Sequence, residues 1–307
     1  MVSFSTRNVA KLDRSDLAVL MAHRKTLTRG NPGKRRLIRP KTPAYPLRWV
    51  QAYRNLNKSF VDKIRSLIER TLIPNLEVIF AQNNRHTPAG AIRSDDFNDD
   101  VQKLLDQIRL ELEGETDDEE LVRNLMLLAK GVSDLNRRNV LGSVKDVLNV
   151  DITLNEPYLD NFLALFARQN AELVSNITDD AIDKVAGIIY NGFRDGRRAE
   201  SLTDDIMKAM DTTESRANFV ARDQVGKLNG QLDRLRQTEL GVNRYTWRTM
   251  EDDRVRETHE ENDGEVFSWD DPPVETGHPG EDYYCRCWAE PVFEDLLDQG
   301  TGENEEA

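Results

Sequence analysis

The sequence of 307 residues contains few cysteines and few apolar residues. Its two cysteines, Cys285 and Cys287, cannot form a disulfide framework, so a reducing compartment is the expected setting. No apolar run reaches the roughly 18 residues of a transmembrane helix, and the N-terminus lacks the apolar core of an export signal, so neither a membrane span nor export is expected. Hydrophobic residues make up 38% and the mean hydropathy is −0.65, which favours an extended, helix-rich structure with much solvated surface.

Charge is distributed unevenly along the chain, whose formal net charge is −13. Residues 1–60 carry 14 Lys/Arg and two acidic residues, a balance of +12. The other 247 residues carry 28 basic and 53 acidic residues, a balance of −25. This uneven distribution of charge indicates a basic arm that binds an anionic partner, joined to an acidic body.

Residues 1–45 have the composition of a basic arm that is partly disordered when unbound, with a helix expected over residues 13–27. We expect the arm to bind phosphate groups or an acidic protein surface; a mobile, solvated terminus is the alternative. Base stacking is not indicated, because no aromatic residue is interleaved among the basic ones. The candidate DNA- or partner-binding residues are Arg24, Lys25, Arg29, Lys34, Arg35, Arg36, Arg39 and Lys41.

Residues 46–241 have the hydrophobic periodicity of helices, with apolar residues at three- and four-residue spacing. Pro74 is expected to end or kink the first helix, and Thr116 with Glu119 forms a capping-box pattern before the third. Gly241 is expected to stop the last helix. The predicted helices cover residues 49–72, 96–112, 117–130 or beyond, 157–175, 179–194 and 214–239.

The helical pattern stops near residue 242, and both cysteines and two of the four histidines follow. Residues 245–249 alternate as in a half-buried strand, with Trp247 as the expected core anchor. Asp252 is expected to cap a short helix that carries Val255 and His259. Asp263 and Gly264 are typical of a hairpin turn. Further strands are predicted over residues 265–269 and 284–292.

The predicted fold class is therefore mainly α, with an elongated helical body and a small α+β module at its C-terminal side. The predicted boundaries give the basic arm residues 1–45, the helical body residues 46–241 and the module residues 242–297. Residues 298–307 form an acidic tail, for which we expect disorder.

Cysteine and histidine in the module are the candidate metal ligands. Cys285 and Cys287 are two residues apart, so both thiols face the same side of a strand. With His259 and His278 they make a Cys2His2 set, which suits a closed, structural zinc site. A metal would stabilise a module with little core. The alternative is that both cysteines are packing residues, that His259 bonds a turn carbonyl and that His278 orders its loop.

The charged residues around His259 allow a second interpretation, a hydrolytic site of a nuclease. His259 would act as general base, and Arg254 or Arg286 would contact phosphate. The alternative gives Asp252 a capping role and the arginines salt bridges. Because the many acidic residues nearby would repel a phosphodiester backbone unless a metal intervened, we favour the structural interpretation and expect no catalytic residue.

The stretch W-x4-D-D-R-V-R-x2-H-x3-D-G-x2-F, followed by H-P-G-x4-C-R-C, resembles the C-terminal signature of the phage minor head, or head morphogenesis, proteins typified by the F protein of phage Mu. The resemblance runs from about Ala221 to about Pro291, roughly a quarter of the chain. One departure is the spacing of four residues between H-P-G and C-R-C, where many relatives have a tighter H-P-N-C-R-C. The signature residues are Trp247, Asp252, Arg254, Arg256, Asp263 and Gly264.

This resemblance implies a minor head protein of a tailed phage, a non-enzymatic virion component that acts in capsid assembly. It implies the portal protein, capsid or scaffold proteins and packaged DNA as partners, with no membrane and no small-molecule substrate. The implied location is the capsid interior near the portal, and the host cytoplasm during assembly. Two alternatives stay open: a metal-assisted or His-dependent nuclease of the phage head, and a DNA-binding scaffold without portal contact.

Overall fold

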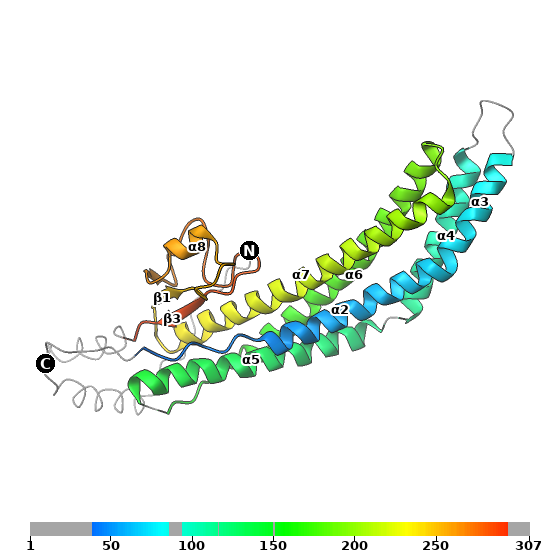
Figure 1. The fold of residues 1–307 in the computed structure, drawn as a ribbon. Coiled ribbons are helices and arrows are strands. Elements are labelled where there is room, and N and C mark those ends of the chain that lie inside the picture. The colour runs from blue at the N-terminus through cyan, green and yellow to red at the C-terminus, as the bar shows by residue number, and fades with distance from the viewer. Residues whose placement is uncertain (1–38, 86–93, 116, 150, 294–307) are drawn as a thin grey trace, which may run out of the picture. The chain divides into compact units, whose positions relative to one another are not determined.

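The computed structural model describes residues 39–85, 94–115, 117–149 and 151–293. Helices dominate it, and a small module with three short strands follows them (Figure 1), so the predicted fold class of mainly α with a small α+β module is confirmed. No helix within the described ranges has both the length and the apolar character that a membrane span requires. The predicted arm helix, Thr116 of the capping box and the acidic tail lie outside the described residues. The helices are α2 (Leu47–Leu67), the π-helix η2 (Ile68–Leu72), α3 (Ile73–Arg85), α4 (Ser94–Glu115), α5 (Asp118–Leu148), α6 (Leu159–Arg194) and α7 (Ala199–Glu239).

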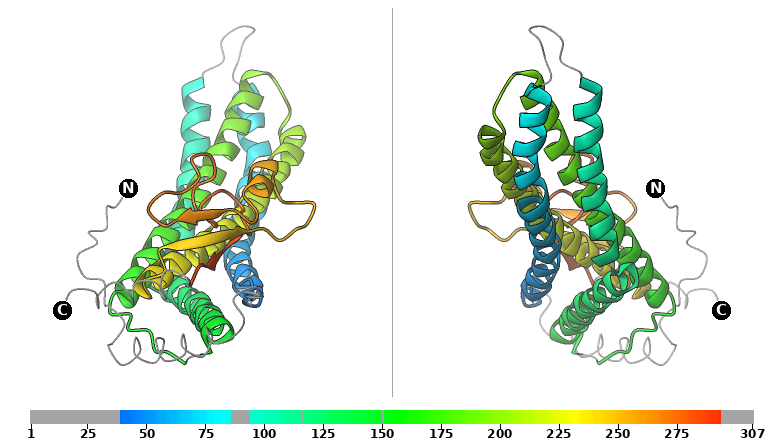
Figure 2. Two further views of the ribbon diagram at one scale, coloured as in Figure 1. Left: turned by 90° about the vertical axis from the view of Figure 1, so that its left-hand side faces the viewer. Right: turned by 90° about the vertical axis from the view of Figure 1, so that its right-hand side faces the viewer.

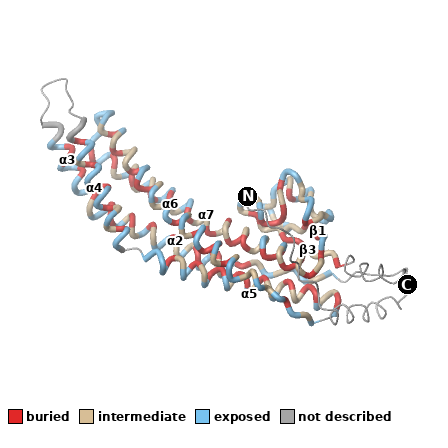
Figure 3. Tube along the Cα trace, turned by 180° about the vertical axis from the view of Figure 1, so that it is seen from behind, coloured by how far each residue is buried: buried red, intermediate tan, exposed pale blue. Residues whose placement is uncertain are grey.

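Helices α6 and α7 are longer than predicted. Two helices were expected over residues 157–194, but α6 is continuous, because buried Val174, Ile177 and Ala181 carry its apolar stripe across the expected gap. Helix α7 begins at residue 199 instead of 214, because buried Leu202 and Ile206 extend its stripe towards the N-terminus. Figure 3 shows such buried positions recurring along both helices.

The C-terminal end of α7 is a Schellman motif, as glycine after the last helical residue predicts. Gly241 has a φ of +79°, which is unstrained only for glycine. Its N–H donates to the Thr238 carbonyl at 3.0 Å, and the N–H of Val242 donates to the Gln237 carbonyl at 2.9 Å. The predicted stop at Gly241 is therefore confirmed, and the chain turns directly into the first strand.

The helix that was expected to end or kink at Pro74 continues through it. Helix α2 passes through the wider turn of η2 into α3, and the N–H of Ile73 bonds the Ile68 carbonyl five residues back. A proline ring clashes with the carbonyl four residues earlier in a regular α-helix, and a π-turn just before it widens the backbone there. Buried Ile68, Leu72 and Leu76 keep the apolar stripe continuous across the irregular turn.

The described chain divides into two compact units, each with its own core. The first contains residues 39–49, 129–149, 151–162 and 223–293, and the second contains residues 50–85, 94–115, 117–128 and 163–222. The predicted helical body is thus shared between both units, and the module belongs to the same unit as the C-terminal parts of α5 and α7. In the second unit Phe97 stacks on Phe193 at 3.5 Å, and Phe80 meets both rings edge-on.

A buried polar network joins α5 and α7 within the first unit. Arg236 is 0% exposed, and its guanidinium donates to Oε1 of Glu156 at 2.7 Å. It also donates to the carbonyl of Ser133 at 2.8 Å and to Oδ1 of Asn136 at 2.7 Å. The amide of Asn136 donates to Oδ1 of Asp233 at 2.7 Å. Because these buried hydrogen bonds connect α5 with α7, they hold the two helices in one register.

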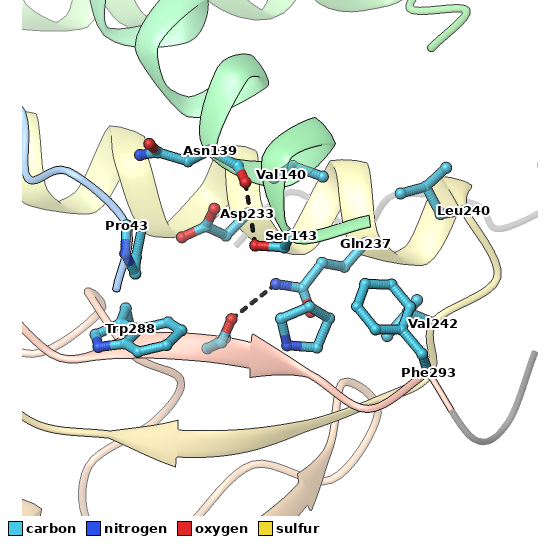
Figure 4. Close-up of a pocket in the computed structure, with 12 residues that line it drawn as sticks. Pro43, Asn139, Val140, Ser143, Asp233, Gln237, Leu240, Val242, Trp288 and Phe293 are labelled. Atoms are coloured by element: carbon cyan, nitrogen blue, oxygen red, sulfur yellow. Dashed lines mark hydrogen bonds between the residues drawn. The ribbon is translucent and has the colours of Figure 1, made fainter. Parts of the chain in front are cut away.

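A cavity of about 20 Å³ lies beside this network, between α5, α7 and the last strand of the module (Figure 4). This volume admits one water molecule and no small-molecule substrate. Across it the Gln237 amide donates to the Ala289 carbonyl at 2.9 Å, which ties the strand to α7. The labelled residues that line it include Pro43, Asn139, Val140, Ser143, Asp233, Trp288 and Phe293.

Asp233 should make the stability of this unit depend on pH. Burial raises the pKa of Asp233 from 3.8 to about 7, although the Asn136 hydrogen bond and the Arg236 charge act in the opposite direction. The native carboxyl keeps its proton over a range in which the unfolded one loses it. Its contribution to stability is therefore complete below pH 3.8 and is lost as the pH rises through about 7.

We therefore expect Asp233→Asn to stabilise the protein at pH 8 and to change little at pH 4. A pKa difference of this size between the folded and unfolded states changes the free energy of unfolding by at most about 4 kcal/mol. Thermal unfolding followed by circular dichroism at the two pH values measures the effect, with Asp134→Asn, an exposed acid of α5, as the control. Equal stability of Asp233→Asn and wild type at pH 8 would show that burial does not raise the pKa of Asp233.

The module contains a three-stranded antiparallel sheet in the order β2-β1-β3. Its elements are β1 (Arg244–Arg248), α8 (Glu257–Glu261), β2 (Val266–Ser268) and β3 (Trp288–Pro291). The predicted first strand is confirmed: Tyr245 and Trp247 point into a small core that also holds Trp269 and Ala289. The third strand is shorter than predicted, because the chain turns at Tyr284, where φ is +62°.

Candidate metal-binding cluster

A cluster of two cysteines and one histidine lies in the module. His259 is on α8, and Cys285 and Cys287 are on the extended segment that leads into β3. The Nδ1 atom of His259 is 3.4 Å from Sγ of Cys287 and 3.6 Å from Sγ of Cys285. All three ligand atoms lie within 4.8 Å of one another. His259 is 2% exposed and Cys285 6%, and Cys287 is half-buried.

Helix α7 holds the loop before the cysteines in place. A Cβ at Gly230 would lie 2.4 Å from the Pro279 carbonyl oxygen, so only glycine allows this approach of loop and helix. The buried carboxylate of Asp223 accepts the backbone N–H of Tyr284 at 3.0 Å. Gly226 also lies close to the Cys285 carbonyl oxygen, with a Cβ there 3.3 Å away. The yellow end of α7 beside the module is visible in Figures 1 and 2.

The other ring nitrogen of His259 faces an acidic residue. Its Nε2 is 3.1 Å from Oδ2 of Asp282, and Nη1 of Arg256 is 2.7 Å from the same oxygen. Arg256 also donates to the Tyr283 carbonyl. On its other side the imidazole meets the indole of Trp247 edge-on, with ring centroids 5.4 Å apart. The ring is therefore fixed in orientation, with Nδ1 directed at the two sulfur atoms.

The three groups shift one another's ionisation. The hydrogen bond from Cys287 lowers the pKa of Cys285 to about 5, with help from His259 and against the effect of burial. The hydrogen bond with Cys285 raises the pKa of His259, whereas burial of the ring acts to lower it. The pKa of Cys287 is raised by its bond to Cys285 and by burial. An ionised Cys285 is a soft anionic ligand and also a nucleophile, but its burial leaves little access for a substrate.

His278, the fourth residue of the predicted zinc set, is not part of this cluster. Its Nδ1 is 2.9 Å from the hydroxyl of Tyr245, and its ring packs against Trp269 with centroids 4.9 Å apart. Burial lowers the pKa of His278, which favours its neutral form. Three of the four predicted ligands therefore come together, and the fourth orders its own loop.

Asp252 does not cap a helix, contrary to the prediction. Helix α8 begins at Glu257 without a side-chain cap, and Val255 lies before it in a turn. Asp252 accepts the backbone N–H of Arg254 at 3.2 Å and forms a double ion pair with Arg286, one contact of which is 2.6 Å. Its carboxylate thus closes a local turn and anchors the residue between the two cysteines.

The remaining signature residues have structural contacts. Oδ1 of Asp263 accepts the Thr249 N–H at 2.7 Å, and Gly264 has the positive φ, +86°, expected at this turn. Arg254 is exposed, 3.6 Å from a carboxylate oxygen of Asp252. The predicted turn at Asp263 and Gly264 is present, but it joins α8 to β2 and is not the tight hairpin turn that was expected, because α8 lies between β1 and β2.

Most of the predicted arm residues lie outside the described chain. These are Arg24, Lys25, Arg29, Lys34, Arg35 and Arg36. Arg39 is exposed, and the Lys41 ammonium lies 3.8 Å from Asp146 on α5. The role of the arm therefore stays a prediction.

Two residues that sequence reasoning missed complete the surroundings of the cluster, Asp282 and Asp223. Asp282 falls in the four-residue spacing that sets this sequence apart from many similar ones. Asp282 could have been found from the sequence, because it is an acidic residue in an unusually long loop next to candidate ligands. Asp223 lies about sixty residues before the loop it binds, and no local pattern marks it.

Comparison with known proteins confirms the resemblance for the C-terminal part of the chain. Residues 183–290 match the family described as "Phage Mu protein F like protein". A protein of Haemophilus influenzae described as "Uncharacterized protein" is 35% identical over 162 residues, which is 52% of this chain and 36% of the relative. The chain thus spans about a third of that relative's length. No solved structure matches the chain.

Proposed function

We propose that this protein is a minor head protein of a tailed phage, which acts in capsid assembly at or near the portal and contacts packaged DNA. The match of residues 183–290 to the Phage Mu F-like family carries this proposal. That segment contains the C-terminal third of α6, all of α7 and the module as far as β3. The proposed partners are the portal protein, capsid or scaffold proteins and DNA, and the proposed location is the virion interior.

The contacts of the module support a structural role over nuclease activity. Arg286, which a nuclease would need against phosphate, is paired with Asp252, and Arg256 is paired with Asp282. Arg248 makes a double contact with Glu290 across β1 and β3, at 2.9 and 3.0 Å. His259, the candidate general base, is almost fully buried. Charged groups committed to one another in this way stabilise loops and leave few donors for a phosphodiester.

The +12 balance of residues 1–60 supports the proposal that the basic arm contacts DNA. Each phosphate that a basic residue neutralises releases counterions, so affinity that arises in the arm should fall steeply with salt. The acidic remainder of the chain would repel DNA, which confines the proposed contact to the arm.

The full chain and a variant without residues 1–45 test both parts of the proposal. We expect the full chain to co-purify with the portal protein of its own phage, and to bind duplex DNA with strong salt dependence. The deletion should abolish most DNA binding, because it removes the basic arm. DNA binding without portal capture would favour a scaffold. Chelator-sensitive DNA cleavage by the full chain would favour the nuclease, and unchanged DNA binding by the deletion would show that the arm is not the DNA contact.

A further inference from the structure

We propose that His259, Cys285 and Cys287 bind a zinc ion as a site with three protein ligands, and that Asp282 orients the histidine. The fourth coordination position would take a non-protein ligand such as water. This inference is independent of the proposed function, because it follows from the geometry of the cluster alone. It also differs from the Cys2His2 set expected from the sequence, because His278 is engaged elsewhere.

The separations between the ligand atoms suit one shared ion. Zinc lies about 2.3 Å from a thiolate sulfur and about 2.0–2.1 Å from an imidazole nitrogen, so a tetrahedral angle places the two ligand atoms ~3.6 Å apart. The two nitrogen-to-sulfur distances here are 3.4 and 3.6 Å. Both nitrogen-to-sulfur separations therefore match a tetrahedral zinc ion. The two sulfurs lie within 4.8 Å of each other, and on one tetrahedral ion they would be ~3.8 Å apart.

The near-equal distances also argue against hydrogen bonding as the whole explanation. A ring nitrogen has one lone pair or one hydrogen, so it can serve both sulfurs only through a bifurcated hydrogen bond, which is weaker at each of them than a direct one. Nδ1 of His259 is almost equidistant from two sulfurs, as an atom that shares an ion with both of them would be. A point between the three atoms is where the ion would lie.

Asp282 supplies the orienting contact that metal-bound histidines usually have. A ligating histidine commonly donates its second ring N–H to a carboxylate, which fixes the tautomer and the ring plane. Nε2 of His259 faces Asp282 at 3.1 Å, and Arg256 holds that carboxylate from behind. Since Nε2 and Nδ1 are on opposite sides of the ring, Asp282 acts on the histidine and not as a fourth ligand.

The donor set and its surroundings favour zinc among the common ions. Thiolate and imidazole ligands suit zinc, whereas magnesium and calcium take oxygen ligands. Cys287 packs against the small apolar core of the module, so that one side of the ion would be dry. The ion would join α8 to the segment before β3, two parts of the chain that are 26 residues apart. A cross-link of this kind stabilises a module whose buried core is small.

Metal analysis of the purified full chain tests the proposal. We expect about one zinc ion per chain when the protein is prepared under reducing conditions without chelator. Replacement by cobalt should give the visible bands of tetrahedral cobalt and a thiolate-to-cobalt charge-transfer band. Less than about a tenth of an equivalent of zinc, also after addition of zinc, would overturn the site.

Single substitutions identify the ligands. His259→Gln, Cys285→Ser and Cys287→Ser should each lose the metal, and His278→Gln, a buried histidine of the same module, is the matched control that should keep it. Asp282→Asn should weaken zinc affinity about 10- to 100-fold without changing the cobalt spectrum, with recovery in Asp282→Glu. Loss of metal from His278→Gln equal to that from His259→Gln would overturn the three-ligand site in favour of the four-residue set.

A measurement on the wild-type chain remains decisive if the ligand variants do not fold. Titration with a mercurial reagent modifies the two cysteines, the only thiols in the sequence. Zinc held by these thiolates should be released in step with their modification, which a zinc-sensitive dye reports. Zinc that stays bound after both thiols have reacted would show that the ion lies elsewhere, and would overturn the proposal.

Discussion

Replacing Arg236 with alanine is expected to lower the free energy of unfolding by about 3–5 kcal/mol. The guanidinium is fully buried and donates to Glu156, to Asn136 and to both the carbonyl and the hydroxyl of Ser133. Alanine would remove all of these bonds and leave the Glu156 side chain, itself 3% exposed, with the ion pair to the more exposed Arg137 at 3.0 Å in place of its shortest contact. A buried charge that loses its partner costs more than the pair had contributed.

Urea unfolding followed by circular dichroism measures this loss, and two further variants test its cause. Arg138→Ala, at an exposed arginine of α5, should change stability by less than about 0.5 kcal/mol. Glu156→Gln combined with Arg236→Ala should be less unstable than the sum of the single changes, because it removes the buried charge that has lost its Arg236 partner and keeps only Arg137. Additive effects would show that the lost volume, and not the charge pair, explains the instability.

Replacing Trp247 with alanine is expected to cost about 3–5 kcal/mol in the stability of the C-terminal module. The indole is 0% exposed at the centre of the central strand, and it meets His259 and Phe267 edge-on. The core around it contains few other residues, mainly Tyr245, Trp269 and Ala289. Since these residues are anchored in short strands, the structure cannot collapse far into the space that alanine leaves.

Hydrogen exchange of the module's backbone amides distinguishes this local effect from a global one. Protection should fall in β1 and β3 of Trp247→Ala, while the helices of the second unit keep their protection. Val266→Ala, at an exposed residue of the adjacent strand, is the control and should leave exchange unchanged. Wild-type protection in Trp247→Ala would mean that the indole does not support the sheet. The variant should also bind zinc more weakly, because Trp247 supports the ring of His259.

Periodicity in the sequence was sufficient to predict the fold class, and its errors have a local cause. Most of the helices were anticipated, because their apolar stripes are visible at three- and four-residue spacing. Helix α3 was not, because an end or kink was expected at Pro74. The gap expected near residue 177 arose from polar neighbours in α6, where burial of Ile177 overrides them. The start of α7 was missed for a similar reason, since the stripe through Leu202 and Ile206 is set among acidic and polar residues.

Glycine and aromatic positions in the module were also predicted from local chemistry. Gly241 and Gly264 adopt positive φ where α7 ends and where the chain turns from α8 into β2, conformations that favour glycine in any fold. Tyr245 and Trp247 face inwards because alternate residues of a strand point to opposite sides of the sheet. The same rule predicted that the thiols of Cys285 and Cys287 face the same side. The two cysteines do lie close together, but they precede β3 and are not part of it.

The sequence by itself therefore determined most of the helices, the approximate places of the strands, the uneven charge and the pool of four candidate ligands, because each depends on neighbours along the chain. Only the tertiary structure decided which side chains come into contact. It brought His259 to both cysteines and to Asp282, turned His278 towards Tyr245, and paired Arg236 with Glu156 across 80 residues. These contacts depend on the distances between segments that are far apart in the sequence. Packing sets those distances, and no local sequence pattern encodes them.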